Sequence, residues 1–443
     1  MQGPLAGIMN SLPLGAQGAG QELQVTPLRK LDTYCPQLDD QKLTPAALQA
    51  RETRDAERLE GTVSSSLGGR MGRTSSIGMG IRRADTMQLA GIVPMEQAAL
   101  AAGGDVLACS SRERLNSRVH EKNVLPVSLD HGQTGDVFAL TVGDEKIAIF
   151  KPVRGEHFER KSLRTGQGWV REESVYLVDR LCGSQAGVPV TSRGTIEVGG
   201  ETLEGSVQAF VSDVIGFIED FAMPRDPAKA NEFVAQTAAE ALAMLDMRVF
   251  NMDRHSGNLL LLKDASPHLL GPIDHGCCLP PWWCLGEANF EAWQDWSQLS
   301  QPPSDHARQI ARNATERLDG TCHTLSNVGL EAPAIVTLRL CTLFLRVGVF
   351  DLGLPLGRLA ALMVRGDGPG IGELSWLEAQ VLQVARAAGS SVREETDDRY
   401  GDKELVVEGE DEGLDVGAFL DGLESVFRRE LPVAAALHGA TRY

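Results

Sequence analysis

The chain has 443 residues and a net charge of −18 at pH 7, and 42% of its residues are hydrophobic. This length is enough for two or three domains with full apolar cores, and the acidic balance excludes nucleic acid as a main partner, because binding phosphate backbones needs clustered Lys and Arg. No uninterrupted apolar run approaches the roughly 20 residues of a membrane-spanning helix, so we expect a cytoplasmic protein whose membrane contact is peripheral, and eight scattered cysteines without an apolar leader agree with a reducing compartment.

The first 120 residues carry few large apolar groups, and we predict a largely disordered regulatory region over 1–120. Within it, residues 69–86 place hydroxyl groups two to four positions after arginines. This pattern is typical of a phosphorylated regulatory segment, and it is equally typical of a solvated linker that charge keeps extended.

Order is expected from about residue 121, with strands over 124–129, 137–142 and 146–151 that form a meander. The first turn contains Gly132 and Gly135, and the third strand ends at Lys151. A glycine-bearing turn followed by a lysine on the third strand is how kinases contact nucleotide phosphates. The alternatives are an ordinary hairpin and a solvated lysine at the end of a strand.

Helical spacing of apolar residues predicts a helix over 168–181, on which Glu172 can face Lys151. Such an ion pair would hold the lysine against phosphates; otherwise Glu172 only belongs to the charged face of an amphipathic helix. Strands over 194–198 and 206–211 complete a small lobe, and a long helix is expected from 226 to about 248.

Two acidic motifs follow that helix. Asp253 and Asn258 are spaced as in a kinase catalytic loop, where the Asp orients the attacking hydroxyl and the Asn holds magnesium. An apolar run over 259–262 predicts a buried strand, and after a turn Asp274 stands where a kinase places its main metal ligand. One such hexapeptide arises easily by chance, whereas the whole arrangement is much rarer.

These residues resemble the phosphatidylinositol 3- and 4-kinase superfamily, and most closely the plant-type gamma group of phosphatidylinositol 4-kinases, which is related to the type II enzymes. The matching pieces, in the family's order, are Ile149-Phe-Lys-Pro152, Arg171-Glu-x-x-x-Tyr-Leu-Val-Asp179, Gly187-Val-Pro-Val-Thr191, Gly205-Ser-Val-Gln-Ala-Phe210, residues 245–258 with Asp253-Arg-His-Ser-Gly-Asn258, and residues 272–280 with Ile273-Asp-His-Gly276. The resemblance implies an α+β, bilobal kinase-like fold, with a β-rich N-lobe over 121–212, a mostly helical C-lobe over 213–388, and an acidic tail over 389–443.

Carried over position by position, the resemblance implies a role for each matching residue. The implied assignments are Gly132, Gly135 and Lys151 on the ATP phosphates, Glu172 as partner of Lys151, Gln208, Phe210 and Val211 at the adenine-contacting hinge, Asp253 at the catalytic centre, and Asn258 and Asp274 on magnesium. His255 fits either proton transfer or charge stabilisation, and it also fits a purely structural place in the loop.

The implied reaction is transfer of the ATP γ-phosphoryl group to the inositol 4-hydroxyl of phosphatidylinositol, with Mg²⁺, or Mn²⁺ in its place. A Ser/Thr protein kinase of the same fold is an alternative, because the catalytic loop does not decide between a lipid and a protein hydroxyl. A nucleotide-binding scaffold without turnover is the other alternative, although such a protein would be free to lose Lys151, Asp253, Asn258 and Asp274. The sequence predicts neither the oligomeric state nor a regulator.

Two further segments lead to hypotheses. In the place of an activation loop, Trp282 and Trp283 either pack against the large lobe or dock on a lipid surface, with Cys277 and Cys278 as candidates for acylation. The tail over 389–443 has 14 acidic and 6 basic residues. We expect it to contain one short helix over 416–431 and to be dispensable for stability and chemistry.

Overall fold

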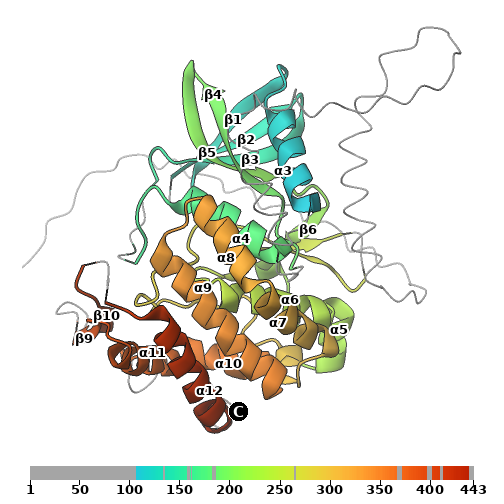
Figure 1. Cartoon of the computed structure of the whole chain (residues 1–443). Helices are drawn as coiled ribbons and strands as arrows, with labels where there is room; N and C mark the ends of the chain where they lie inside the picture. Colours follow the sequence, from blue (N-terminus) through green and yellow to red (C-terminus); the bar gives the residue numbers. More distant parts are fainter. Residues whose placement is uncertain are drawn as a thin grey trace, which may run out of the picture. The chain divides into compact units, whose positions relative to one another are not determined.

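The computed structural model describes residues 106–132, 135–156, 160, 162–181, 186–263, 266–366, 372–396, 402–409 and 413–438. These residues all lie within one compact unit, Ser76–Tyr443. Figure 1 shows that they form a small lobe built on a sheet and a larger, mostly helical lobe. The predicted bilobal α+β class is confirmed, and the Arg- and Ser-rich segment over 69–86 lies outside the described residues.

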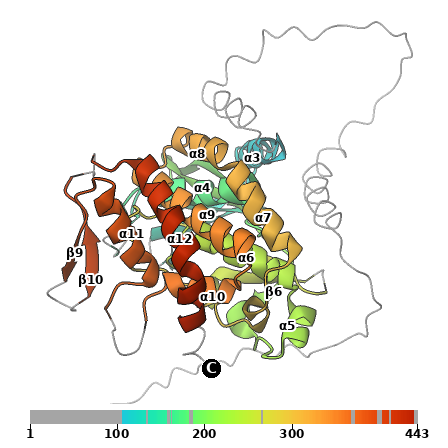
Figure 2. The ribbon, with the colours of Figure 1, turned by 60° about the horizontal axis from the view of Figure 1, so that its bottom comes forward.

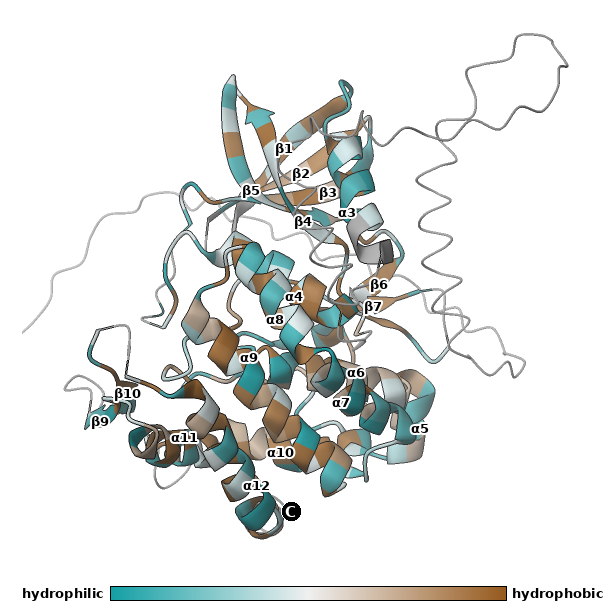
Figure 3. Ribbon diagram, viewed as in Figure 1, coloured by the Kyte–Doolittle hydropathy of each residue, from teal (hydrophilic) through white to brown (hydrophobic). Residues whose placement is uncertain are grey.

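The small lobe is built on an antiparallel sheet with the strand order β1-β2-β3-β5-β4. Its strands are β1 (Val124–Gly132), β2 (Gly135–Val142), β3 (Glu145–Pro152), β4 (Thr191–Val198) and β5 (Glu201–Ala209). The first three form the predicted meander, which turns between β2 and β3 at Gly143, where φ is +59° and a side chain would be strained. The long apolar stretches of these strands are brown in Figure 3, and Leu140, Ala148 and Phe150 are fully buried.

Two helices, α3 (Val106–Val119) and α4 (Gly168–Leu181), pack against β4 and β5 of this sheet. Helix α4 has the predicted bounds, whereas α3 lies near the end of the 1–120 region, at a place where no helix was predicted. Leu115 and Val119 of α3 join the core of the small lobe, and Arg112 forms an ion pair with the buried Glu173 of α4. A composition averaged over 120 residues hides one short helix whose apolar groups complete a neighbouring core.

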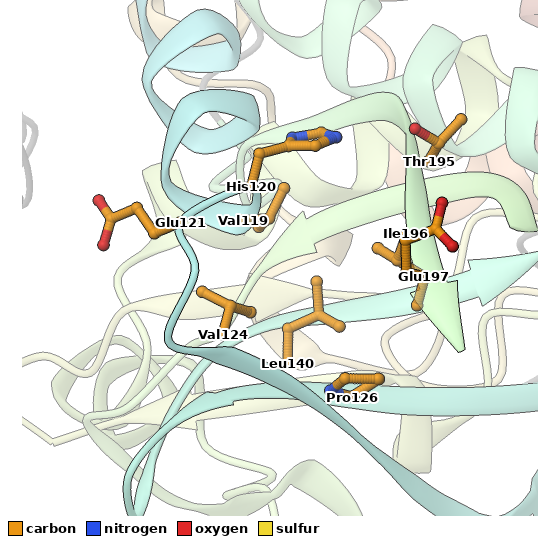
Figure 4. A pocket seen from close by; sticks show the side chains of 9 residues that line it. All are labelled: Val119, His120, Glu121, Val124, Pro126, Leu140, Thr195, Ile196 and Glu197. Atoms are coloured by element: carbon orange, nitrogen blue, oxygen red, sulfur yellow. The ribbon is translucent and has the colours of Figure 1, made fainter. Parts of the chain in front are cut away.

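A cavity of about 190 Å³ lies between the C-terminal end of α3 and the sheet (Figure 4). It is lined by Val119, His120, Glu121, Val124, Pro126, Leu140, Thr195, Ile196 and Glu197. The lining contains none of the predicted site residues, and the volume is below the roughly 300 Å³ at which ligand pockets usually begin. This cavity is therefore a packing feature of the helix–sheet junction.

The large lobe combines a small antiparallel sheet, in the order β6-β7-β8, with a layer of helices. Its elements up to residue 387 are β6 (Val214–Phe217), η1 (Ile218–Asp220), α5 (Pro227–Phe233), α6 (Gln236–Arg248), η2 (Ser256–Asn258), β7 (Leu259–Leu262), β8 (Leu270–Pro272), η3 (Ser297–Ser300), α7 (Asp305–Glu316), α8 (Leu318–Asn327), α9 (Ala332–Leu345), the π-helical η4 (Arg346–Asp351), α10 (Leu356–Met363) and α11 (Trp376–Ala387). The single helix predicted over 226–248 is in fact two, because Val234 is extended and pairs with His268.

The last part of the chain is not a detached tail. Strands β9 (Arg393–Thr396) and β10 (Lys403–Val406) form a hairpin, and α12 (Val416–His438) continues beyond the predicted end at 431. Figure 2 shows α12 lying across α9 and α10, and it contacts both of these helices as well as α11. Phe419, Leu423 and Phe427 are fully buried in the main core. The tail therefore packs on the large lobe, which is contrary to the reason for expecting it to be dispensable.

Helix α9 and the following π turn, Ala332–Asp351, are together long and apolar enough to cross a membrane, but 67% of the apolar stretch within them is buried inside the protein. Arg339 and Arg346 interrupt the apolar run of this segment in the sequence. Leu338, Leu340 and Phe344 are fully buried. The apolar surface of this helix is therefore used by the core of the large lobe.

Candidate active site

The side chain of Lys151 connects the small lobe to the large lobe. It lies near the end of β3 and pairs in register with Ser206 of β5, so hydrogen bonds on that side fix its backbone. Its Nζ donates to Glu172 Oε1 at 2.6 Å and to Asp274 Oδ1 at 2.9 Å. The predicted contact between Lys151 and Glu172 is present, and the same ammonium also reaches the segment that follows β8.

Charge sets the protonation of Lys151 and Asp274. Burial would lower the pKa of Lys151, but the carboxylates of Asp274 and Glu172 outweigh burial and raise that pKa well above its usual range. For Asp274, burial would raise the pKa, but the charge and the hydrogen bond of Lys151 lower it overall. Asp274 is therefore ionised at neutral pH. Its φ of +56° is unusual for a residue other than glycine, and such backbone strain concentrates at functional sites.

Asp246 organises the catalytic loop from the last turns of α6. Its fully buried carboxylate accepts hydrogen bonds from Asn251 Nδ2 at 2.9 Å, from Arg254 Nε at 3.0 Å and from Trp293 Nε1 at 2.8 Å. Asn251 Oδ1 in turn accepts from the backbone N–H of Asp253 at 2.9 Å. The loop that carries Asp253 is therefore held by satisfied buried polar groups rather than by apolar packing alone.

Arg254 joins the ends of β7 and β8. Its guanidinium donates to the carbonyl oxygens of Asn258 and of Ile273, the latter at 3.0 Å, and its Nη2 lies 2.9 Å from His275 Nε2. Leu259 of β7 pairs with Pro272 of β8. Just beyond this pair, the N–H of Ile273 donates to the carbonyl oxygen of Asn258 at 3.1 Å. Asn258 and Asp274 therefore lie at the same edge of this small sheet. The sequence placed Arg254 and Asp246 inside matching motifs but assigned no role to either.

The residues at this edge suit magnesium, which binds through one or two protein oxygens together with phosphate oxygens. Asn258 Nδ2 donates to Asp253 O at 3.1 Å, so the amide oxygen of Asn258 is turned away from that bond and can act as a ligand. The ionised carboxylate of Asp274 supplies the charge. No cluster of three or more His, Cys, Asp or Glu with metal-binding geometry occurs among the described residues, so the phosphates would have to complete the coordination.

The two histidines beside these motifs have structural contacts. His255 caps η2, because its Nδ1 accepts from the N–H of Gly257 at 3.1 Å. His275 is fully buried, and burial, together with the charges of Arg254 and Lys151, lowers its pKa well below the usual value. A neutral His275 lies behind the Lys151–Glu172 pair, with its Nδ1 3.9 Å from Glu172 Oε2. The structure thus assigns His255 the capping place that the sequence left open.

The predicted nucleotide-contacting residues lie on the small lobe. Gly132 and Gly135 pair across the ends of β1 and β2, and the turn at 133–134 between them lies outside the described residues. Gln208 lies opposite Ile149 in the sheet, and its side chain donates to Thr191 Oγ1 at 3.0 Å, so this side chain contacts β4. Beyond the end of β5, the N–H of Phe210 donates to Ile147 O at 3.0 Å, and Val211 continues into the connection to the large lobe.

The segment after Asp274 packs into the large lobe. Trp282 is 2% exposed and lies 5.5 Å from the ring of Phe419, and Trp283 packs edge-on against it. Cys277 and Cys278 are buried, and burial raises the pKa of Cys277 to about 12. Trp282 therefore takes the packed position that the sequence offered as an alternative to lipid docking, whereas Trp283 is only partly buried. The thiols of Cys277 and Cys278 are covered and stay protonated, which speaks against their acylation.

A strand lysine paired with a helix glutamate, an Asp-x-x-x-x-Asn loop and an ionised Asp after the next hairpin form the arrangement that is typical of a kinase domain. Residues 202–299 match the sequence profile of the family Phosphatidylinositol 3- and 4-kinase. The chain is 28% identical over 305 residues to phosphatidylinositol 4-kinase gamma 5 of Arabidopsis thaliana, covering 61% of this chain and 46% of that protein. It is 32% identical over 210 residues to phosphatidylinositol 4-kinase gamma 4 of Oryza sativa subsp. japonica, covering 41% of this chain and 35% of that protein.

The resemblance predicted from the motifs is thereby confirmed: residues 202–299 match the model of the phosphatidylinositol 3- and 4-kinase family, and the chain is similar to members of the plant gamma group over longer stretches. The chain spans about half the length, or less, of these curated relatives. Among solved structures, the crystal structure of the Helicobacter pylori proinflammatory kinase CtkA matches with a TM-score of 0.33 and 13% identity, covering 54% of this chain and 95% of that one.

Proposed function

We propose that this protein transfers the γ-phosphoryl group of ATP to the inositol 4-hydroxyl of phosphatidylinositol. The observation that carries the proposal is the contact of Lys151 with both Glu172 and Asp274. It brings a phosphate-binding ammonium beside a metal-binding carboxylate at the edge of the small sheet. The names of the curated relatives support the lipid acceptor and the 4-position.

The residues divide the chemistry between them. Asp253 orients the acceptor hydroxyl and accepts its proton, and Lys151 binds phosphate oxygens while Glu172 holds its amine in place. Asn258 and Asp274 would hold magnesium, which supplies charge neutralisation between the β- and γ-phosphates. Arg254 and Asp246 keep these groups in register, so that little reorganisation is needed when the substrates bind.

We further propose that the protein works in the cytoplasm at a membrane surface, since its acceptor is a lipid. Neither Trp282 nor the buried cysteines supply that contact. A protein acceptor is the competing possibility, and no contact among the described residues favours it.

One assay tests the proposal directly. Radiolabelled ATP and Mg²⁺ are offered with phosphatidylinositol vesicles in one arm and with a generic protein substrate in the other. Label in phosphatidylinositol 4-phosphate, abolished by Asp274→Ala and retained by the exposed-surface control Asp421→Ala, supports the proposal. Label in the protein substrate alone overturns it, and no label in either arm, with intact ATP binding, indicates a scaffold.

A further inference from the structure

A second basic side chain, Arg160, contacts the catalytic loop from the small lobe. It lies in the connection between β3 and α4, and its Nη2 lies 2.9 Å from Asp253 Oδ1. Its Nη1 lies 2.8 Å from Glu287 Oε2, and Ser162 Oγ donates to the other oxygen of Glu287 at 3.1 Å. One guanidinium therefore joins the catalytic aspartate to the segment that follows Asp274, where kinases of this class select their acceptor.

Neighbouring contacts fix the position of Arg160. Glu156 accepts hydrogen bonds from the N–H groups of Gly166 and Gly168, which closes the connection at the start of α4. Ser162 and Leu163 are buried, and the N–H of Leu163 donates to Arg160 O at 3.3 Å. Arg160 itself is 28% exposed, so its side chain is anchored at the backbone but can be reached by a ligand.

The chemistry of these contacts points to an anionic acceptor. A guanidinium presents donors in a planar fork that suits carboxylate and phosphate oxygens alike, so a phosphate can replace a carboxylate with little change in geometry. A phosphodiester that approached this region without Arg160 would meet the carboxylates of Asp253 and Glu287. Asp253 must also exchange its contact with Arg160 for the acceptor hydroxyl before transfer.

We propose, resting on the function proposed above, that Arg160 binds the phosphodiester of the inositol phospholipid, leaving Asp253 and Glu287 as it does so. Arg160 is then a residue that selects the acceptor and contributes little to ATP binding. The exchange couples acceptor binding to the release of the catalytic carboxylate.

The test measures KM for phosphatidylinositol in mixed micelles, KM for ATP, and kcat for the full chain. Arg160→Ala should raise KM for the lipid about tenfold, the lower end of the loss expected for a hydrogen bond to a charged group, with KM for ATP and kcat within about twofold of wild type. Arg164→Ala, an exposed arginine of the same connection, removes the same charge and should change none of the three. Arg160→Lys keeps the charge without the fork and should fall between them.

A second arm isolates the phosphate. Soluble glycerophosphoinositol should compete with the lipid better than myo-inositol in wild type, and Arg160→Ala should remove that preference. Glu287→Gln removes the charge that competes with the lipid phosphate for Arg160 in the partly exposed Arg160–Glu287 pair. This change should lower the lipid KM by up to about fivefold. An unchanged lipid KM in Arg160→Ala, an equal rise in the ATP KM, or a retained preference for glycerophosphoinositol would each overturn the assignment while leaving the lipid kinase function standing. Absence of any lipid turnover in wild type would instead refute the proposed function itself.

Discussion

Helix α12 makes a sharp prediction about stability. Phe427 is fully buried, with its ring 5.4 Å from that of Phe344 and 6.0 Å from that of Trp376. Replacing it with Ala removes most of a buried aromatic side chain and leaves a cavity among rings that cannot close it. The expected loss is about 3 to 5 kcal/mol of unfolding free energy, the range measured for buried Phe to Ala changes.

The assay is thermal or urea unfolding of the full chain. For a domain of this size, about 2 °C per kcal/mol converts the loss into a Tm lower by roughly 6 to 10 °C. The matched control is Val433→Ala on the same helix, where the side chain is 61% exposed and the change should stay within about 0.5 kcal/mol. If Phe427→Ala is no less stable than Val433→Ala, α12 does not pack against the large lobe in solution, and its residues do not belong to the core.

Three further predictions concern the site and its supports. Lys151→Met and Asp274→Ala should each lower phosphoryl transfer about a hundredfold or more, measured by labelled product; Tm should stay close to wild type in Asp274→Ala but fall in Lys151→Met, which leaves the buried carboxylate of Glu172 without its ammonium partner, and near-normal rates would remove both residues from the site. His275 is buried with a lowered pKa, so its stabilising effect is complete above its unfolded pKa near 6.5 and is lost as pH falls toward its folded pKa. Wild type should therefore lose stability between pH 7 and 5 faster than His275→Gln, by at most about 1.4 kcal/mol per pH unit, and parallel pH curves would contradict a buried neutral imidazole. Arg112→Ala leaves the buried carboxylate of Glu173 with Arg193 as its remaining basic partner and should cost about 1.5 to 3 kcal/mol, the value of a hydrogen bond to a charged group. The exposed Glu113→Ala on the same helix should cost little, and equal stabilities would show that α3 does not stabilise the packing of α4.

Local patterns were enough to predict the strands of the meander, helix α4 and the pairing of Lys151 with Glu172, because each depends on periodicity or on a short motif. The break between α5 and α6 could not be predicted, since it depends on Val234 pairing with His268, which comes from another part of the chain. The same reason explains α3 and α12. Their apolar residues look too sparse for a core of their own, and they are buried only because distant helices and strands supply the rest of the surface.

In the candidate site, too, local motifs were predictable from the sequence and distant contacts were not. Asp253, Asn258 and Asp274 are recognised by spacing within one stretch of about 20 residues, whereas the contact of Arg160 with Asp253 spans 93 positions of sequence. The sequence does contain an indication of the role of Asp246, because a carboxylate near the end of an apolar helix needs hydrogen-bond partners when it is buried. Its partners, Arg254 and Trp293, become visible only when the loop is folded back on α6.

The carboxylates of Asp253 and Asp274 each form an ion pair with a basic side chain of the small lobe. Lys151 holds Asp274, and Arg160 holds Asp253. In the proposed mechanism, each pair joins a substrate-binding cation to a carboxylate that needs a different partner during the reaction, namely magnesium for Asp274 and the acceptor hydroxyl for Asp253. Because both cations come from β3 and the connection that follows it, binding of the nucleotide and of the acceptor acts on one continuous stretch of chain. Under this proposal, phosphate oxygens that draw Lys151 and Arg160 away would expose both carboxylates where the phosphoryl group is transferred.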